Sequence, residues 1–213
     1  MKQPQGYEDG TDNVCKLLRS LYGLKQASRC WNQKFTSFLK KFKLKATTYD
    51  PCVFVSQIGD RKIVLGIFVD DGIIAATHDE DISNLIKHLT QEFEVRVSDA
   101  EYFIGLEIER KMDGSIHVSQ RAYIRKILSK FRMMDAYAVS TPAESQIVND
   151  SSEAVTGYPY REAVGSLMYL AIATRPDIAF AVGRASRRLS NPCQSDVNSV
   201  KRIFKYLRGT MEL

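Results

Sequence analysis

The sequence predicts an α+β fold, with strand hairpins and helices in residues 1–118 and helices alone in residues 119–213. Residues 52–76 are rich in β-branched side chains and contain turn signals, which is typical of antiparallel strands. Apolar residues recur at helical spacing before this stretch, after it, and in three segments beyond residue 158. The chain has 213 residues, 44% of them hydrophobic, which is enough for one large core or two small ones.

Two helices and two hairpins are predicted in the first part. The first helix covers about residues 24–42 and ends at residues 47–51. Strands follow, with turns at Gly59-Asp60 and Asp71-Gly72. A second helix begins near Asp79, with Asp81 early in it. Alternating runs on both sides of Asp113-Gly114 then predict another hairpin.

The second part is predicted to be helical. A short helix covers residues 124–131, and residues 140–158 are rich in Ser, Thr, Asn, Pro and Gly, which indicates a loop or linker. Three further helices are expected near 160–173, 177–190 and 195–208. Pro176 suits the start of the second of these, because proline there loses no helical hydrogen bond.

Cysteine usage and hydropathy exclude several classes of protein. The four cysteines are scattered without a C-x-x-C pair, so we expect reduced thiols, an intracellular setting and no zinc site. No apolar run approaches the roughly 20 residues of a membrane-spanning helix, and no signal peptide is evident, so no membrane partner is expected.

Charge is distributed in three blocks. Residues 1–50 carry a net charge of +6, residues 51–118 carry −7, and residues 119–213 carry +6. This pattern is compatible with an ordinary solvated surface. A solvated surface is the usual meaning of a modest charge bias, and the functional interpretation is basic flanks that bind a polyanion around an acidic centre that recruits cations. Charge alone does not choose between them.

Asp70 and Asp71 lie side by side within the apolar stretch GIFVDDGIIAA at 66–76. They could form a hairpin turn with both charges in water, or a site for a divalent cation. The apolar arms favour a hairpin covered on its faces, with the turn at one end of a sheet. Because adjacent strand residues point to opposite faces, we expect one Asp to be the principal ligand and the other to lie at the margin. We choose Asp70 as the principal ligand and Asp71 as the marginal one. One or two carboxylates are sufficient for magnesium when substrate phosphates complete its coordination.

Seven blocks carry a resemblance to a known family, and they stand in this order: KLLRSLYGLKQASRCW at 16–31, FVDD at 68–71, YFIGLEI at 102–108, GSIHVSQRAYIRKIL at 114–128, STP at 140–142, YREAVGSLMYLAIATRPDIAFAV at 160–182 and RIFKYLRGT at 202–210. They resemble the reverse transcriptases of copia-type LTR retrotransposons over nearly the whole chain. FVDD is similar to the x-x-D-D box of that family, with Phe68 where tyrosine is usual, so a phenolic hydrogen bond is lost there.

The resemblance implies a right-hand polymerase. Residues 1–118 would form part of a palm with a ferredoxin-like antiparallel sheet, and residues 119–213 a helical thumb or connection. Asp70 and Asp71 would be catalytic ligands of Mg²⁺ or Mn²⁺, with two ions in the intact enzyme. The implied partners are an RNA or DNA template-primer and a dNTP, and the implied location is cytoplasmic, in a virus-like particle, or nuclear.

The resemblance also assigns three sets of binding residues. Nucleotide and template contacts are implied for Gly23, Leu24, Lys25, Gln26, Phe68 and Val69. Primer contacts are implied for Tyr102, Phe103, Ile104, Gly105 and Leu106. Contacts with the nucleic-acid backbone are implied for Arg187, Arg188, Lys201, Arg202, Lys205 and Arg208. Taken alone, the first set would be a helix-capping turn and the basic residues a solvated helix face.

The start of the chain matches the family just after the first carboxylate motif of the palm. We therefore expect an N-terminally truncated fragment that lacks the fingers and a third metal-binding carboxylate, and is inactive or nearly so alone. In the full element, integrase would lie upstream and ribonuclease H downstream. The alternative is a non-catalytic nucleic-acid-binding remnant of a transposon polyprotein. A metal-dependent phosphohydrolase would need further ligands near the Asp pair, whereas Asp79 and Asp81 are expected at a helix start.

Overall fold

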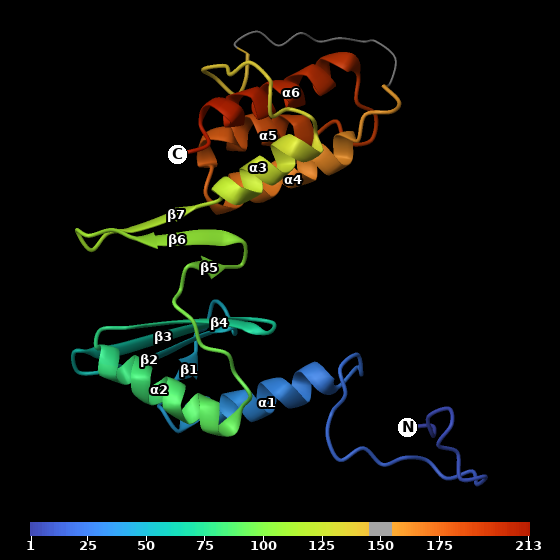
Figure 1. Ribbon diagram of the computed structural model, residues 1–213, viewed down its shortest axis with the longest axis vertical. Helices are drawn as coiled ribbons and strands as arrows, with labels where there is room; N and C mark the ends of the chain where they lie inside the picture. Colours follow the sequence, from blue (N-terminus) through green and yellow to red (C-terminus); the bar gives the residue numbers. More distant parts are fainter. Residues whose placement is uncertain (145–154) are drawn as a thin grey trace. The chain divides into compact units, whose positions relative to one another are not determined.

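A computed structural model describes residues 1–144 and 155–213, which form two compact units, Met1–Ser98 and Asp99–Leu213 (Figure 1). Both units combine helices with an antiparallel sheet, so the predicted α+β class is confirmed. The boundary between the units lies at residue 98 rather than at the predicted residue 118, because the second hairpin is joined to the helices that follow it. Residues 145–154 of the predicted linker lie outside the described residues.

The first unit packs two helices on one face of a four-stranded sheet (Figure 1). Its elements are α1 (Ala27–Lys40), β1 (Lys45–Ala46), β2 (Val53–Ile58), β3 (Arg61–Phe68), β4 (Asp71–Ala76) and α2 (Asp79–Glu92). Phe38 and Leu39 of α1 meet Leu85 of α2 and Leu65 of β3 in one buried cluster. The helical spacing of these residues explains the arrangement, since it gives each helix a single apolar face.

The strand pairing places the turn of the β3–β4 hairpin at Val69-Asp70. Phe68 pairs with Asp71 and Ile67 with Gly72, so the predicted turn at Asp71-Gly72 is wrong. Gly72 instead serves packing between strands, because a Cβ there would lie 3.2 Å from the Ile67 side chain. The predicted turn at Gly59-Asp60 is confirmed, since β2 ends at Ile58 and β3 begins at Arg61.

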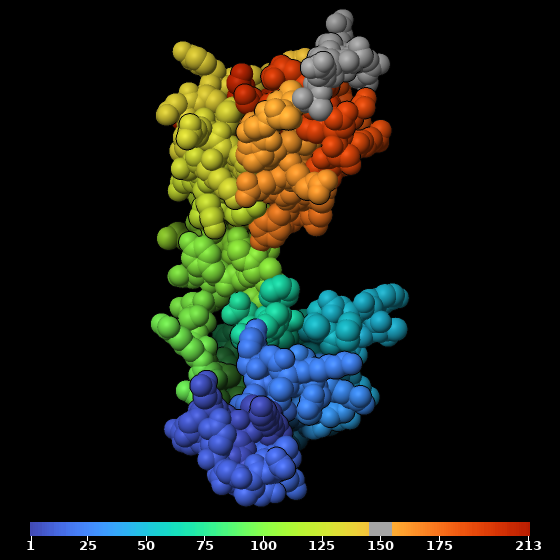
Figure 2. Space-filling view, turned by 90° about the vertical axis from the view of Figure 1, so that its right-hand side faces the viewer, coloured from blue at the N-terminus to red at the C-terminus, as the bar shows by residue number. Residues whose placement is uncertain are grey.

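The second unit joins a three-stranded sheet to a group of helices. Its elements are β5 (Tyr102–Phe103), β6 (Leu106–Arg110), β7 (Ile116–Ser119), α3 (Arg121–Lys130), α4 (Tyr160–Ala173), η1 (Pro176–Ile178), α5 (Ala179–Ser186) and α6 (Gln194–Gly209). The hairpin around Asp113-Gly114 is confirmed as β6–β7. The helix predicted over 177–190 is split into η1 and α5. In the space-filling view, the green strands adjoin the yellow-green α3 and the orange α4 (Figure 2).

The core of this unit lies between its helices. Ile124 and Leu128 of α3, Leu167 of α4 and Phe204 of α6 belong to one buried cluster. These are positions that the helical periodicity of the sequence assigns to apolar faces. Among the described residues, no helix is both long and apolar enough to cross a membrane.

Candidate functional site

Asp70 and Asp71 lie at the tip of the β3–β4 hairpin, where both side chains are exposed. Asp70 is the second residue of the two-residue turn, and Asp71 is the first residue of β4. Within the described residues, neither carboxylate makes a hydrogen bond or an ion pair with another group of the protein. Both are therefore open to a cation or to water.

The sheet gives the two carboxylates different settings. Asp71 pairs with Phe68, so both side chains lie on the same face as Gly66 and Ile73. This face is opposite the one that Leu65 shares with α1 and α2. Within Met1–Ser98, the helices thus cover one face of the hairpin. The sequence predicts a hairpin that is covered on both faces, so this part of the prediction differs from the structure of this unit. The other face carries Asp71 beside half-buried apolar side chains.

Val69 takes a strained backbone conformation next to the carboxylates. Its φ is +55°, in the left-handed region that β-branched residues rarely adopt. The side chains of Phe68 and Val69 are 53% and 65% exposed, although both are apolar. Strained residues and exposed apolar groups cluster at functional sites more often than elsewhere. These observations favour a binding role for the hairpin tip over a plain solvated turn.

The donor set suits a hard divalent cation but supplies few ligands. Carboxylate oxygens are the ligands that Mg²⁺ and Mn²⁺ prefer. Across residues 1–144 and 155–213, no group of three or more His, Cys, Asp or Glu side chains is placed to hold a metal ion. Asp79 and Asp81 lie in the first turn of α2, as expected, and Asp81 pairs with Arg61 at 2.9 Å. The hairpin therefore offers two carboxylates, Asp70 and Asp71.

Residues 23–26 form the turn that leads into α1. Gly23 has a φ of +88°, which a glycine adopts without strain, and the Ala27 amide donates to the Leu24 carbonyl at 3.0 Å. Gln26 precedes the helix without capping it through its side chain. The helix-entry turn is thus confirmed, whereas the implied nucleotide contacts of Gly23, Leu24, Lys25 and Gln26 stay a prediction.

Aromatic residues early in α1 divide between core and surface. Phe35 and Phe38 are buried in the core of this unit. Trp31 lies parallel to the Phe35 ring, with 5.0 Å between ring centroids, and is 44% exposed. The indole is therefore stacked on the core but partly exposed, rather than buried.

The implied primer-binding residues form a second tight hairpin, in the other unit. Phe103 pairs with Leu106, which leaves Ile104 and Gly105 as a two-residue turn with φ of +53° and +77°. Positive φ at both positions is the pattern of a type I′ turn. The side chain of Tyr102 is 69% exposed, and the Tyr169 hydroxyl donates to the Ile104 carbonyl. No local sequence pattern indicates this contact of Tyr169, since 65 positions separate the two residues.

The six basic residues fall into two groups. Arg187 and Arg188 follow α5 and are exposed. On α6, Arg202 pairs with Glu144 at 3.1 Å, and the Arg208 Nε donates to the Met134 carbonyl at 2.7 Å. Both guanidinium groups thus have partners within the protein. The remaining two, Lys201 and Lys205, are partly buried on the same helix. Contacts of these six residues with a nucleic-acid backbone stay a prediction.

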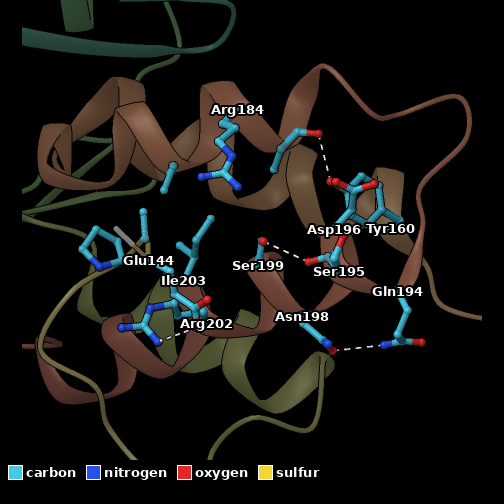
Figure 3. A pocket seen from close by; sticks show the side chains of 14 residues that line it. Glu144, Tyr160, Arg184, Gln194, Ser195, Asp196, Asn198, Ser199, Arg202 and Ile203 are labelled. Atoms are coloured by element: carbon cyan, nitrogen blue, oxygen red, sulfur yellow. Dashed lines mark hydrogen bonds and ion pairs between the residues drawn. The ribbon is translucent and has the colours of Figure 1, made fainter. Parts of the chain in front are cut away.

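A cavity of about 350 Å³ lies among α4, α5 and α6 in the second unit. Figure 3 shows Arg184 on one side of it and Arg202 with Glu144 on another. Burial raises the pKa of Tyr160, whose hydroxyl donates to the Ala185 carbonyl at 2.9 Å. Asp196 accepts from the Cys193 amide at 2.9 Å at the start of α6. The contacts of Tyr160 and Asp196 serve helix packing. Of the predicted site residues, Arg202 alone lines this cavity.

The comparisons with known proteins bear on the whole chain. Residues 1–145 match the family model described as reverse transcriptase (RNA-dependent DNA polymerase). The chain is 39% identical to the retrovirus-related Pol polyprotein from transposon TNT 1-94 of Nicotiana tabacum, over 99% of this chain and 17% of that protein. It is 36% identical to the corresponding polyprotein from transposon RE1 of Arabidopsis thaliana, over 99% of this chain and 15% of that protein.

A shorter relative is matched along most of its length. The chain is 28% identical to the putative transposon Ty5-1 protein of Saccharomyces cerevisiae, over all of this chain and 71% of that protein. By contrast, it spans about one sixth of the length of the two plant polyproteins. No solved structure matches the chain.

Proposed function

Because the chain belongs to the reverse transcriptase (RNA-dependent DNA polymerase) family, in its copia-type retrotransposon branch, we propose that it forms part of the polymerase site of a transposon Pol polyprotein. The observation that carries this proposal is the Asp70-Asp71 pair at the tip of the β3–β4 hairpin. Two adjacent exposed carboxylates beside strained Val69 suit cation binding better than a plain turn.

The proposed reaction is template-directed nucleotidyl transfer. The 3′-hydroxyl of the primer attacks the α-phosphate of a dNTP, and pyrophosphate leaves. Asp70 and Asp71 would hold the divalent cations, which when bound would supply activation of the hydroxyl and stabilisation of the leaving oxygens. The exposed side chains of Phe68 and Val69 would contact the template or the nucleotide.

The two units take separate parts in this proposal. The unit Met1–Ser98 contributes palm elements, with the turn at Gly23 allowing close approach to the nucleotide. The unit Asp99–Leu213 contributes the β5–β6 hairpin to the primer and its helices to a thumb or connection. Template-primer and dNTP are the proposed ligands, and the other segments of the polyprotein are the proposed partners.

We further propose that a third carboxylate, from another segment of the polyprotein, completes the site. Two divalent ions would need more ligands than the two carboxylates of the hairpin, Asp70 and Asp71. Electrostatic stabilisation of this kind commonly contributes several kcal/mol to the transition state. Since each 1.36 kcal/mol is tenfold in rate, a loss of three such increments leaves about a thousandth of the activity.

Primer extension tests the proposal. Residues 1–213 should bind a primer-template and extend it at background level, whereas a longer segment of the same polyprotein that includes the first carboxylate motif should extend it. Asp70→Ala in the longer protein should abolish extension. Asp60→Ala is the matched control, because Asp60 is an exposed carboxylate in the turn before β3.

Two results would count against the proposal. Comparable extension by residues 1–213 and by the longer segment would show that no third carboxylate is needed. Binding of the primer-template without extension by either protein would favour the non-catalytic nucleic-acid-binding remnant.

A further inference from the structure

The turn between β5 and β6 needs support from outside the hairpin. Ile104 is β-branched yet has a φ of +53°, a conformation that is unfavourable for such residues. Conformations of this kind persist where the surrounding structure holds them in place. Gly105 follows with a φ of +77°. The exposed side chain of Tyr102 and the partly exposed side chain of Ile104 remain accessible at the hairpin.

Tyr169 of α4 supplies support at this turn. Its hydroxyl donates a hydrogen bond to the Ile104 carbonyl. A Cβ on Gly105 would lie 2.8 Å from the same hydroxyl oxygen, so the turn and the tyrosine are in close contact. Glycine is thus required at 105 by its φ and by the approach of Tyr169.

The tyrosine is itself held by the neighbouring helix. The rings of Tyr169 and Tyr123 of α3 pack edge to face, with centroids 5.0 Å apart and an interplanar angle of 87°. The Tyr123 hydroxyl lies 3.4 Å from the Ser166 carbonyl of α4, to which it donates. Further along the hairpin, Glu107 of β6 accepts from the Ala122 amide at 2.6 Å. The hairpin is therefore joined to α3 and α4 at its turn and along β6.

We infer that Tyr169 is a positioning residue that sets the place of the β5–β6 turn, and through it the 3′ end of the primer strand. The inference rests on the proposed function, which assigns the primer contacts to residues 102–106. Tyr169 acts through the Ile104 carbonyl and does not itself touch the primer. Its hydroxyl couples the turn to the helices, so the primer end and the helical unit move together.

Tyr169→Phe tests the inference, because it removes the hydroxyl and keeps the ring that packs on Tyr123. Residues 1–213 would be titrated, by fluorescence anisotropy, with a primer-template that has a recessed 3′ end and with a blunt duplex of the same sequence. Affinity for the recessed end should fall about three- to tenfold, or about 0.6–1.4 kcal/mol. Affinity for the blunt duplex should not change.

Tyr123→Phe is the matched control. It removes a hydroxyl from the same pair of rings, but that hydroxyl donates to Ser166 and makes no contact with the turn. Both affinities should stay at the level of the unsubstituted chain. An equal loss on the two duplexes with Tyr169→Phe would indicate a merely structural role and overturn the inference.

Amide hydrogen exchange at residues 104–106 separates the failure of this inference from that of the proposed function. Tyr169→Phe should accelerate exchange there, and Tyr123→Phe should not. Faster exchange with unchanged affinity for the recessed end would contradict the inference alone. If the unsubstituted chain does not bind the primer-template, the proposed function fails, and with it the assignment of the primer end to this turn.

Discussion

Asp70 and Asp71 are neighbours in sequence but differ in backbone setting. Asp71 is held in β4 opposite Phe68, whereas Asp70 lies in the turn after strained Val69. A turn residue is less constrained by strand pairing, so its carboxylate can adjust to the geometry of a cation. This difference supports Asp70 as the principal ligand in our proposal.

We expect residues 1–213 to bind Mg²⁺ or Mn²⁺ weakly, and Asp70→Asn to weaken binding more than Asp71→Asn. Two exposed carboxylates with few further ligands give a weak site, and the amide removes the charge with little change of shape. Calorimetry or the effect of bound Mn²⁺ on water proton relaxation measures this. Asp60→Asn serves as the control. Equal and negligible effects of both substitutions would return the pair to the plain-turn interpretation.

The sequence predicted that a hairpin bears the two carboxylates, but it placed the turn wrongly. Asp-Gly is a strong hairpin signal, which favoured Asp71-Gly72. In the structure, Leu65 pairs with Ile74 and joins the core, and this register moves the turn to Val69-Asp70. Nothing in a local pattern indicates that a valine will take a positive φ, because that strain is imposed by strand pairing.

At the scale of elements, the helices were predicted best. Single apolar faces located α2, α3, α4 and α6 to within a few residues, since burial of such faces drives helix packing. The segment after Pro176 begins as the short 3-10 helix η1, which a helical period alone does not distinguish from α-helix. Contacts between distant elements, such as that of Tyr169 with Ile104, leave no periodic signal.

Arg175 joins two elements from a buried position. Its guanidinium donates to both carboxylate oxygens of Asp177, at 3.0 and 2.7 Å, and to the carbonyl and hydroxyl of Thr210 at 2.8 and 2.7 Å. The side chain is 2% exposed and lies 5.7 Å from the ring centroid of Tyr206. The segment at η1 is thereby tied to the end of α6.

Arg175→Met should lower the free energy of unfolding of the second unit by about 3 kcal/mol, because several hydrogen bonds of a buried guanidinium are lost together. The Asp177 carboxylate and the carbonyl and hydroxyl of Thr210 are then left without this donor. Urea denaturation followed by circular dichroism measures the change. Arg161→Met, at an exposed position of α4, should have little effect. A similar small effect of Arg175→Met would contradict the role of this network.

The ion pair of Arg175 with Asp177 predicts that the stability of the second unit depends on pH. Burial alone would raise the pKa of Asp177, but hydrogen bonds from Arg175 and Tyr206 outweigh it and lower the pKa below its usual 3.8. A lowered folded-state pKa gives stability that is present above about pH 4 and is lost as the pH falls below it. The urea midpoint of Asp177→Asn should therefore depend less on pH in that acidic range.

At the scale of the whole molecule, net charge alone does not say which basic residues would contact nucleic acid. The last third of the chain is basic, with a net charge of +6 over residues 119–213. Arg202 and Arg208 already bind Glu144 and the Met134 carbonyl. Arg187 and Arg188 are exposed just beyond α5. Exposure, which composition does not report, therefore favours these two as contacts with phosphate.

The salt dependence of primer-template binding tests whether Arg187 and Arg188 contribute more to phosphate binding than Arg202 and Arg208. Each phosphate contact on a duplex contributes roughly 0.9 to the slope of log affinity against log salt concentration. Replacing Arg187 and Arg188 together by Gln should thus make the slope shallower by about 1.8, because both contacts are lost. The double substitution of Arg202 and Arg208 by Gln should change the slope less, since their guanidinium groups are engaged within the protein. If the slope is unchanged when Arg187 and Arg188 are replaced, these residues are ordinary solvated surface. Other basic side chains must then bind the phosphates of the duplex.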